Sequence, residues 1–243
     1  MNNQVEAFKK EFPEIIKLAA EPLKEEEETK MVEIVMLKFK TPEVEAKAVQ
    51  KIIENTDYPF KLTVYDNRVN GGNISKIWNK LIQESTCDYV CIIDSDAFVP
   101  KYEDKCWLTR LMETFESEPE ALMVVPTLDV TSCPPMTANK AEAYPCKPEP
   151  LTEIYAAQCA LYKKDLFDVV GYFDEDFLLY GQDSLFGVKI LEKRIKAFVR
   201  KDVNLEHLGS YSMDEIRKTE EEFMNKERTY AHHLFSLKIK KLI

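Results

Sequence analysis

The sequence contains Tyr89-Val90-Cys91-Ile92-Ile93-Asp94-Ser95-Asp96, an apolar run that ends in two carboxylates separated by one residue. The run is short, continuous and rich in β-branched side chains, which is typical of a buried central strand. In open α/β sheets, ligands bind in the crevice at the carboxyl ends of the strands, and hard divalent cations take oxygen ligands. Asp94 and Asp96 are therefore candidate ligands of such a cation. The motif is weak by itself, because Asp-x-Asp also occurs by chance in acidic loops.

The composition is that of an ordinary globular protein with an acidic surface. Hydrophobic residues make up 45% of the 243 residues, so the chain can bury a large core. The net charge is -10, which opposes tight nonspecific binding of the protein to nucleic acid or anionic lipid. We expect no integral membrane segment, because no run has the required length and hydrophobicity. The first residues lack the layout of a signal peptide, which favours a cytoplasmic location. The basic end at 238–243 is interpreted either as a frayed helix end or as a contact with a membrane surface.

The cysteines are expected to be reduced. None of them forms a CxxC pair, and Cys87 and Cys91 flank or lie within the predicted strand, where buried thiols are common. Cys133 and Cys146 bracket a proline-rich loop and could pair in an oxidising compartment, but without a secretion signal we favour free thiols.

Strand patterns alternate with helix patterns along most of the chain. The expected strands are 32–37, 61–66, 89–94, 122–128, 154–162 and 197–199, and the expected helices are 41–55, 74–83, 105–116 and 184–193. This alternation indicates βαβ units and an α/β fold with a mostly parallel central sheet flanked by helices. Residues 1–30 and 211–243 have helical patterns and are expected to extend a domain at 31–210. Residues 131–151 contain five prolines and are expected to form an irregular functional loop.

A second motif follows downstream, Gly171-Tyr172-Phe173-Asp174-Glu175-Asp176-Phe177-Leu178-Leu179-Tyr180-Gly181-Gln182-Asp183. With Asp94-Ser95-Asp96 before it and His207 after it, this segment resembles the G-x-F-D-E-x-F…G-E-D segment of family-2-type nucleotide-sugar glycosyltransferases with the GT-A fold. Asp66 at a strand end, and an Asn-x-Gly turn at 70–72 followed by Asn79, agree with the family in order and spacing. The resemblance covers residues 31–210 and implies a Rossmann-like GT-A sheet.

The resemblance implies a metal-assisted donor site. Asp96 would hold Mn²⁺ or Mg²⁺, which bridges the two phosphates of the donor and acts as a Lewis acid on the leaving group. His207 corresponds to a further metal ligand, and an imidazole beside a carboxylate suits Mn²⁺ better than Mg²⁺. Asp94 corresponds to the carboxylate that contacts the donor ribose or sugar, and Asp66 to the acid that hydrogen-bonds the nucleotide base. On local sequence alone, Asp66 can instead cap the following turn, and His207 can be an ordinary core or surface histidine.

Two predicted helix starts carry the remaining candidates. Residues 70–73 are explained most simply as a turn and a helix start, and Asn73 is a candidate donor-binding residue because helix amides there could face a phosphate. Asp183 is the candidate general base, since Gly181 allows a sharp turn and a helix from Ser184 would place the carboxylate at a helix N-terminus. A plain N-cap is an equally good explanation of Asp183 from local sequence.

The chain departs from the family pattern near the candidate base. Gln182 stands in place of the family's Glu, and Leu185 stands where an acid is common. Residues 187–189 replace a basic position, and the first strand ends at 36–39 without the common Pro-Thr turn. These differences concern the donor and acceptor details rather than the fold.

The sequence thus predicts a metal-dependent glycosyltransferase that moves a sugar from a nucleotide-diphosphate donor to an acceptor hydroxyl. A single convincing base and no enzyme nucleophile favour an inverting displacement. The alternatives are a non-catalytic nucleotide-sugar-binding relative and a sugar nucleotidyltransferase, although the latter would carry a glycine-rich basic loop where residues 38–42 stand. The acceptor could be a saccharide, a lipid-linked saccharide, a protein or a modified nucleic-acid base, and the acidic charge disfavours the last.

Overall fold

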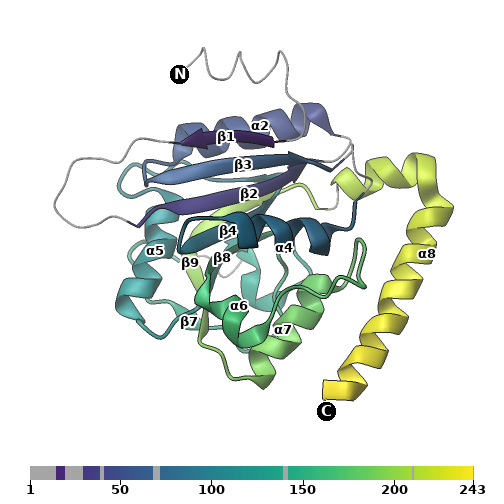
Figure 1. Ribbon diagram of the computed structural model, residues 1–243. Helices are drawn as coiled ribbons and strands as arrows, with labels where there is room; N and C mark the ends of the chain where they lie inside the picture. The colour runs from purple at the N-terminus through teal and green to yellow at the C-terminus, as the bar shows by residue number, and fades with distance from the viewer. Residues whose placement is uncertain are drawn as a thin grey trace.

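A mixed β-sheet forms the centre of the molecule, and helices cover it on both faces (Figure 1). The computed structural model describes residues 15–19, 30–38, 41–67, 72–138, 142–209 and 211–242. Within these ranges the strands pair in the order β1-β3-β2-β4-β8-β6-β9-β5, and β7 also pairs with β9.

The strands are β1 (Ile15–Ala19), β2 (Val32–Lys38), β3 (Phe60–Asp66), β4 (Tyr89–Asp94), β5 (Ala97–Phe98), β6 (Met123–Leu128), β7 (Glu149–Pro150), β8 (Cys159–Lys163) and β9 (Ala197–His207). The helices are α2 (Pro42–Asn55), α4 (Ile74–Glu84), α5 (Trp107–Ser117), α6 (Asp165–Val170), α7 (Gln182–Glu192) and α8 (Tyr211–Leu242), with a 3₁₀ helix η1 (Pro134–Met136). These elements confirm the predicted alternation of strands and helices.

The strand directions bring several chain segments to one edge of the sheet. β3, β2 and β4 are parallel, and β6 is parallel to β9. β8 lies between β4 and β6 and is antiparallel to both, so β6 and β9 run in the same direction as β4. The carboxyl ends of β3, β4 and β9 and the amino end of β8 therefore lie along the same edge, where ligands bind in sheets of this kind.

The core lies between the sheet and its helices. Every residue from Tyr89 to Ile93 is at most 2% exposed, as their apolar pattern predicted. α4 and α2 cover opposite faces of β2, β3 and β4 (Figure 1). On α4 the buried apolar side chains recur at helical spacing, and this amphipathic stripe explains why the segment forms a helix that packs on the sheet: Ile77, Trp78, Leu81 and Ile82.

The N-terminal segment corrects one expectation. Residues 15–19 form strand β1, antiparallel to β3 with Ile15 opposite Tyr65, where the sequence predicted a helix. Without β1, β3 would present a row of unpaired backbone N–H and C=O groups, and pairing satisfies them, which local helix propensity does not reveal. The rest of the predicted helical extension, residues 1–14 and 20–29, lies outside the described residues.

Two further segments differ from expectation. The strand predicted at 154–162 begins only at Cys159, because residues 151–158 are irregular. The proline-rich segment at 131–151 is not wholly irregular, since it contains η1 and the two-residue strand β7 that pairs with β9. The six cysteines form no disulfide, as expected.

The C-terminal segment is helical, as predicted. α8 is broken at Glu220, where φ is -136°, and its longer second part runs past α7 (Figure 1). Among the helices that the structure describes, none combines the length and the hydrophobicity required to span a bilayer.

Candidate functional site

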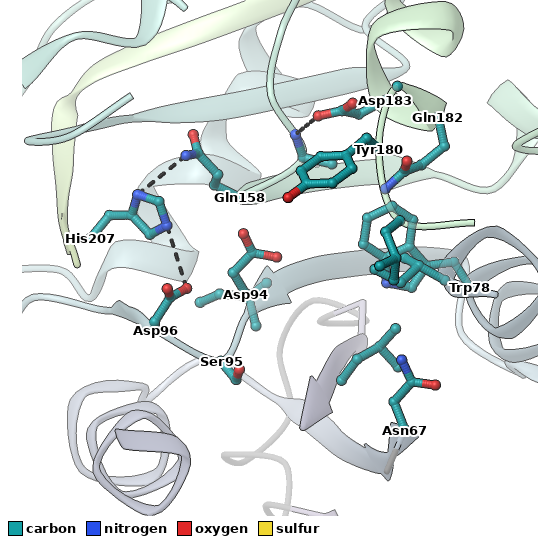
Figure 2. Close-up of a pocket in the computed structure, with 16 residues that line it drawn as sticks. Asn67, Trp78, Asp94, Ser95, Asp96, Gln158, Tyr180, Gln182, Asp183 and His207 are labelled. Carbon is teal, nitrogen blue, oxygen red and sulfur yellow. Dashed lines mark hydrogen bonds and ion pairs between the residues drawn. The ribbon is translucent and has the colours of Figure 1, made fainter. Parts of the chain in front are cut away.

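A pocket of about 230 Å³ opens at the carboxyl edge of the sheet (Figure 2). Its lining comes from the carboxyl ends of β2, β4 and β9, the residue after β3, helices α4 and α7, and the segments just before β8 and α7. The polar or aromatic lining residues are Asn67, Trp78, Asp94, Ser95, Asp96, Gln158, Tyr180, Gln182, Asp183 and His207. The pocket thus brings together Asp94, Asp96, Asp183 and His207, which the sequence singled out from three distant segments.

Asp94, Asp96 and His207 form one cluster. A ligand atom from each lies within 4.8 Å of the others, and Nε2 of His207 is 3.4 Å from Oδ1 of Asp96. The short strand β5 creates this proximity, because it pairs Ala97 with His207 and because the Leu208 N–H donates to the Asp96 carbonyl at 3.1 Å. Asp96, just before β5, and His207, at the end of β9, therefore lie side by side although they are more than 100 residues apart in the sequence.

The orientation of the His207 ring suits a metal ligand. Its Nδ1 lies 2.7 Å from the carbonyl oxygen of Val130, a distance that requires Nδ1 to carry the proton and donate it. When the ring is neutral, Nε2 then presents its lone pair towards Asp96. Metal-binding histidines characteristically donate their other ring N–H to a backbone carbonyl or a carboxylate, so the residues present fit a divalent cation.

The electrostatics of the cluster also favour a cation. Burial and the neighbouring Asp96 carboxylate raise the pKa of Asp94 to about 7, against the lowering effect of His207. Burial lowers the pKa of His207, but its hydrogen bond to Asp96 and the charges of Asp94 and Asp96 outweigh burial and raise that pKa to about 9. The half-buried Asp94 and the buried Asp96 thus share one imidazolium, which leaves excess negative charge that a divalent cation would neutralise.

Asp183 faces the same pocket from the start of α7. Its Oδ1 accepts the Ser184 N–H at 2.7 Å and its Oδ2 accepts the Ala157 N–H at 3.2 Å. Burial raises the pKa of Asp183, while these backbone donors lower it. The N-cap of α7 is Gly181, so the N-cap explanation of Asp183 is wrong. Gly181 has φ +85°, and a Cβ there would lie 2.9 Å from the Phe177 ring, so the turn before Asp183 requires glycine.

Helix α4 fixes the segment that leads to this turn. The Asn79 amide accepts the Phe173 N–H at 3.0 Å and donates to the Phe173 carbonyl at 2.9 Å, and Ser75 Oγ donates to the Phe177 carbonyl at 3.1 Å. From the other side, Lys238 on α8 pairs with Asp174 at 2.7 Å. The backbone of Phe173 and Phe177 and the carboxylate of Asp174 therefore anchor the segment that leads to Gly181 and Asp183, whereas Tyr180 lines the pocket.

Two candidate donor-binding residues lie outside the pocket lining. Asp66 ends β3, is buried and pairs with Lys38 at 3.7 Å, and its neighbour Asn67 lines the pocket instead. Asn73 caps α4 by accepting the Lys76 N–H at 2.9 Å and donates to the Glu175 carbonyl at 2.6 Å. The structure does not bring Asp66 or Asn73 into contact with the cluster.

Sequence reasoning did not single out Gln158 or Asn67, and it interpreted Trp78 as core. Trp78 is indeed buried and packs against Phe173, yet it also lines the pocket. Gln158 precedes β8, and its carbonyl accepts the Asp94 N–H at 2.9 Å. In the sequence, Gln158 is recognisable only as a polar residue next to an apolar strand. Its place in the site depends on the antiparallel pairing of β8 with β4, which the sequence pattern does not show.

Comparison with known proteins supports the fold. No protein-family model matches the sequence, and a search of curated protein sequences finds no match. Among solved structures, the chain is similar to GalNAc-T7 with UDP, GalNAc and Mn²⁺ (TM-score 0.54, 9% identity, 75% of this chain and 44% of that one). It is also similar to S. aureus TarS (TM-score 0.54, 13% identity, 81% of this chain and 64% of that one). A third similar structure is the mannosyltransferase PcManGT from Pyrobaculum calidifontis with GDP-Man and Mn²⁺ (TM-score 0.50, 17% identity, 72% of this chain and 56% of that one).

The chain spans only 44 to 64% of the length of these structures, and their sequences are at most 17% identical to it. The likeness therefore concerns the architecture of the sheet and its helices. In that architecture, the cluster of Asp94, Asp96 and His207 lies at the carboxyl edge of the sheet. The chain therefore shares the GT-A fold of these structures.

Proposed function

We propose that this protein is a metal-dependent glycosyltransferase that transfers a sugar from a nucleotide-diphosphate donor to a hydroxyl acceptor. The observation that carries the proposal is the placement of Asp94, Asp96 and His207 in the same pocket as Asp183. A cation site and an isolated carboxylate at one pocket are what a displacement of nucleoside diphosphate by a hydroxyl requires. The similar structures with UDP or GDP-Man and Mn²⁺ support this assignment.

Asp96 and His207 would hold the cation, with Asp94 either as a third ligand or as a contact to the donor. Mn²⁺, or alternatively Mg²⁺, would supply charge neutralisation for the departing diphosphate. Burial of Asp96 and His207 and the Nδ1–H bond to Val130 keep these ligand atoms oriented before the donor arrives.

Asp183 would act as the general base on the acceptor hydroxyl. Its carboxylate is fixed by the Ser184 and Ala157 amides, so an acceptor oxygen at hydrogen-bond distance would lose its proton to a group of defined position. The other two carboxylates of the described lining, Asp94 and Asp96, belong to the proposed cation site, and assigning them there leaves Asp183 as the base, which favours a single in-line displacement with inversion. We further propose a saccharide hydroxyl as the acceptor, because the net charge of -10 opposes nucleic acid.

The first test is binding of nucleoside diphosphates and nucleotide sugars, with and without Mn²⁺, by titration calorimetry. We expect one nucleotide series to bind only with the metal, and Asp96→Ala to abolish that binding. Asp88→Ala, an exposed aspartate outside the pocket, serves as the matched control. Nucleotide binding that ignores both the metal and Asp96→Ala would contradict the assignment.

The second test separates catalysis from binding alone. Asp183→Asn should leave donor binding unchanged and lower donor hydrolysis and sugar transfer by about 10²- to 10⁴-fold, the usual contribution of a general base. A protein that binds the donor without turnover, and that is indifferent to Asp183→Asn, would be a non-catalytic nucleotide-sugar-binding relative. Release of pyrophosphate from a nucleoside triphosphate and sugar phosphate would instead indicate a nucleotidyltransferase.

A further inference from the structure

Buried polar atoms without partners are concentrated in the pocket. Among the described residues, three buried side-chain atoms lack a hydrogen bond: Thr114 Oγ1, Gln158 Oε1 and Gln182 Oε1. The two glutamines both line the pocket. Because a buried polar group without a partner is costly, such atoms at a pocket indicate where a ligand supplies the missing bond.

One of the two amide atoms of Gln158 has a polar neighbour within the protein. It lies 3.2 Å from Nδ1 of His207, and that nitrogen donates its proton to Val130. Two donors therefore face each other when the Gln158 Nε2 is directed at the ring. Exchanging the two amide atoms places Oε1 beside the Nδ1–H, which removes this conflict and moves Nε2 to the buried position. Gln158 is then engaged in orienting the metal ligand.

The Oε1 of Gln182 shows no comparable contact among the described residues. Its residue is only 5% exposed, it lines the pocket, and its Oε1 contacts no donor in the described part of the chain. Exchange of its amide atoms would place Nε2, a buried donor, at the position that Oε1 occupies. Figure 2 draws its amide directed to the interior of the pocket, on the same side as Tyr180. A hydroxyl satisfies either orientation, because it both donates and accepts.

The position of Gln182 indicates which hydroxyl this is. It directly precedes Asp183, the proposed base, across the pocket from the cluster at Asp94 (Figure 2). If the proposed function holds, the anomeric carbon lies between the base and the diphosphate, so the sugar ring of the donor occupies this space. Gln182 is then adjacent to the ring hydroxyls rather than to the nucleotide.

The charge of the pocket limits the sugar. The described lining residues include three carboxylates and no lysine or arginine, and their one cationic group is His207. A carboxylated sugar would bring a fourth carboxylate without a cation at the sugar end. A neutral amide at 182, where the related pattern has Glu, also keeps negative charge away from Asp183.

We propose that Gln182 hydrogen-bonds a ring hydroxyl of the donor sugar and makes the protein select donors that carry a neutral, hydroxylated sugar. This inference rests on the proposed function. Gln182 is a specificity residue in this scheme, and Asp183 remains the base.

The experiment compares the Mn²⁺-dependent affinity of one nucleoside diphosphate with that of its sugar-bearing forms. For the wild type and Gln182→Leu, the ligands are the diphosphate alone, the neutral hexose conjugate, its single-deoxy analogues and the corresponding uronic acid conjugate. Gln50→Leu provides the same chemical change at an exposed position on α2. Gln182→Glu tests the added charge.

We expect the wild type to bind the neutral conjugate more tightly than the uronic acid conjugate and to lose about five- to tenfold in affinity for one deoxy analogue, the usual size of one hydrogen bond. Gln182→Leu should lose the same factor for the complete hexose, stop distinguishing that deoxy analogue, and keep the affinity for the diphosphate. The retained diphosphate affinity also shows that the variant is folded. Gln50→Leu should behave as the wild type, and Gln182→Glu should weaken binding of the uronic acid conjugate further.

The outcomes separate the two levels of the proposal. If no nucleoside diphosphate binds in the presence of Mn²⁺, the proposed function fails and this inference fails with it. If the diphosphate binds but Gln182→Leu keeps the full preference for the hexose and the discrimination against every deoxy analogue, the role of Gln182 is overturned. A wild type that prefers the uronic acid conjugate would overturn the neutral-sugar assignment.

Discussion

At the scale of single residues, His207 links cation binding to pH. In the metal-free protein the pKa of His207 is raised to about 9, so its Nε2 carries a proton at neutral pH and must lose it before a cation binds. Mn²⁺ affinity should therefore rise about tenfold per pH unit between pH 7 and 8.5. Below pH 7 the slope should steepen as Asp94 also takes up a proton.

Calorimetric titration of Mn²⁺ in buffers of different ionisation enthalpy measures both the affinity and the protons released. His207→Gln should weaken binding and remove the slope above pH 7. Wild-type Mn²⁺ affinity that does not change over this range would contradict a metal site that includes His207.

The same residues predict how the stability of the metal-free protein depends on pH. The pKa of Asp94 is raised from 3.8 to about 7 and that of His207 from 6.5 to about 9, so the folded state binds both protons more tightly than the unfolded state. The stabilisation from His207 is complete below pH 6.5 and is lost as the pH rises through 9, and that from Asp94 is lost between pH 3.8 and 7. We expect Tm to fall as the pH increases from 6.5 to 8.5.

Thermal unfolding with and without Mn²⁺ tests this dependence. The cation should raise Tm more at pH 8.5 than at pH 6.5, because it replaces the lost positive charge and binds more tightly there. In His207→Gln, the decrease in Tm above pH 6.5 should become shallower. A decrease that is equally steep in the variant would assign the pH dependence to groups outside the cluster.

At the scale of elements, the interaction between α4 and the segment before Asp183 controls the position of the proposed base. Asn79 is buried and makes hydrogen bonds to both backbone groups of Phe173 and to the Glu175 carboxylate at 3.1 Å. Asn79→Ala would leave buried backbone groups of Phe173 unpaired, at a cost of about 1–3 kcal/mol in the free energy of unfolding. Sugar transfer should decrease further than stability alone explains, since Asp183 loses its fixed position.

A second variant for this prediction is Asn79→Asp, which keeps the acceptor for the Phe173 N–H but replaces the donor by an oxygen that faces the Phe173 carbonyl and the Glu175 carboxylate. Denaturant unfolding and transfer rates measured at a temperature where both variants are folded separate the two effects. Asn79→Ala with normal transfer activity would show that the downstream segment does not need α4 for its position.

The elements also show what the sequence could predict and what it could not. Asp94, Asp96, Asp183 and His207 could be predicted to converge, because the carboxyl ends of parallel strands and a helix start meet at one edge of a sheet. Gln158 could not, because β8 inserts antiparallel beside β4, and strand order is set by pairing over long sequence separations. Strand β1 was missed for the same reason. The local pattern of residues 15–19 does not reveal that β3 lacks a partner on that side.

At the scale of the whole molecule, the acidic charge makes a prediction about donor binding. The chain carries a net charge of -10, and no described lining residue of the pocket is a lysine or an arginine, so a nucleoside diphosphate is repelled at long range and attracted only through the cation. Removal of Mn²⁺ by a chelator should therefore lower the affinity for the nucleoside diphosphate by about 100-fold or more, equivalent to roughly 2.7 kcal/mol.

The acidic charge also predicts how donor binding depends on salt. Salt screens long-range repulsion over about 10 Å at 0.1 M, so with saturating Mn²⁺ an increase in NaCl from about 50 to 300 mM should not weaken binding. Stopped-flow association rates should rise over the same range, because like charges no longer slow the encounter. A steep loss of affinity with salt would instead show that basic side chains beyond the described pocket lining hold the phosphates, and the donor site would have to extend to them.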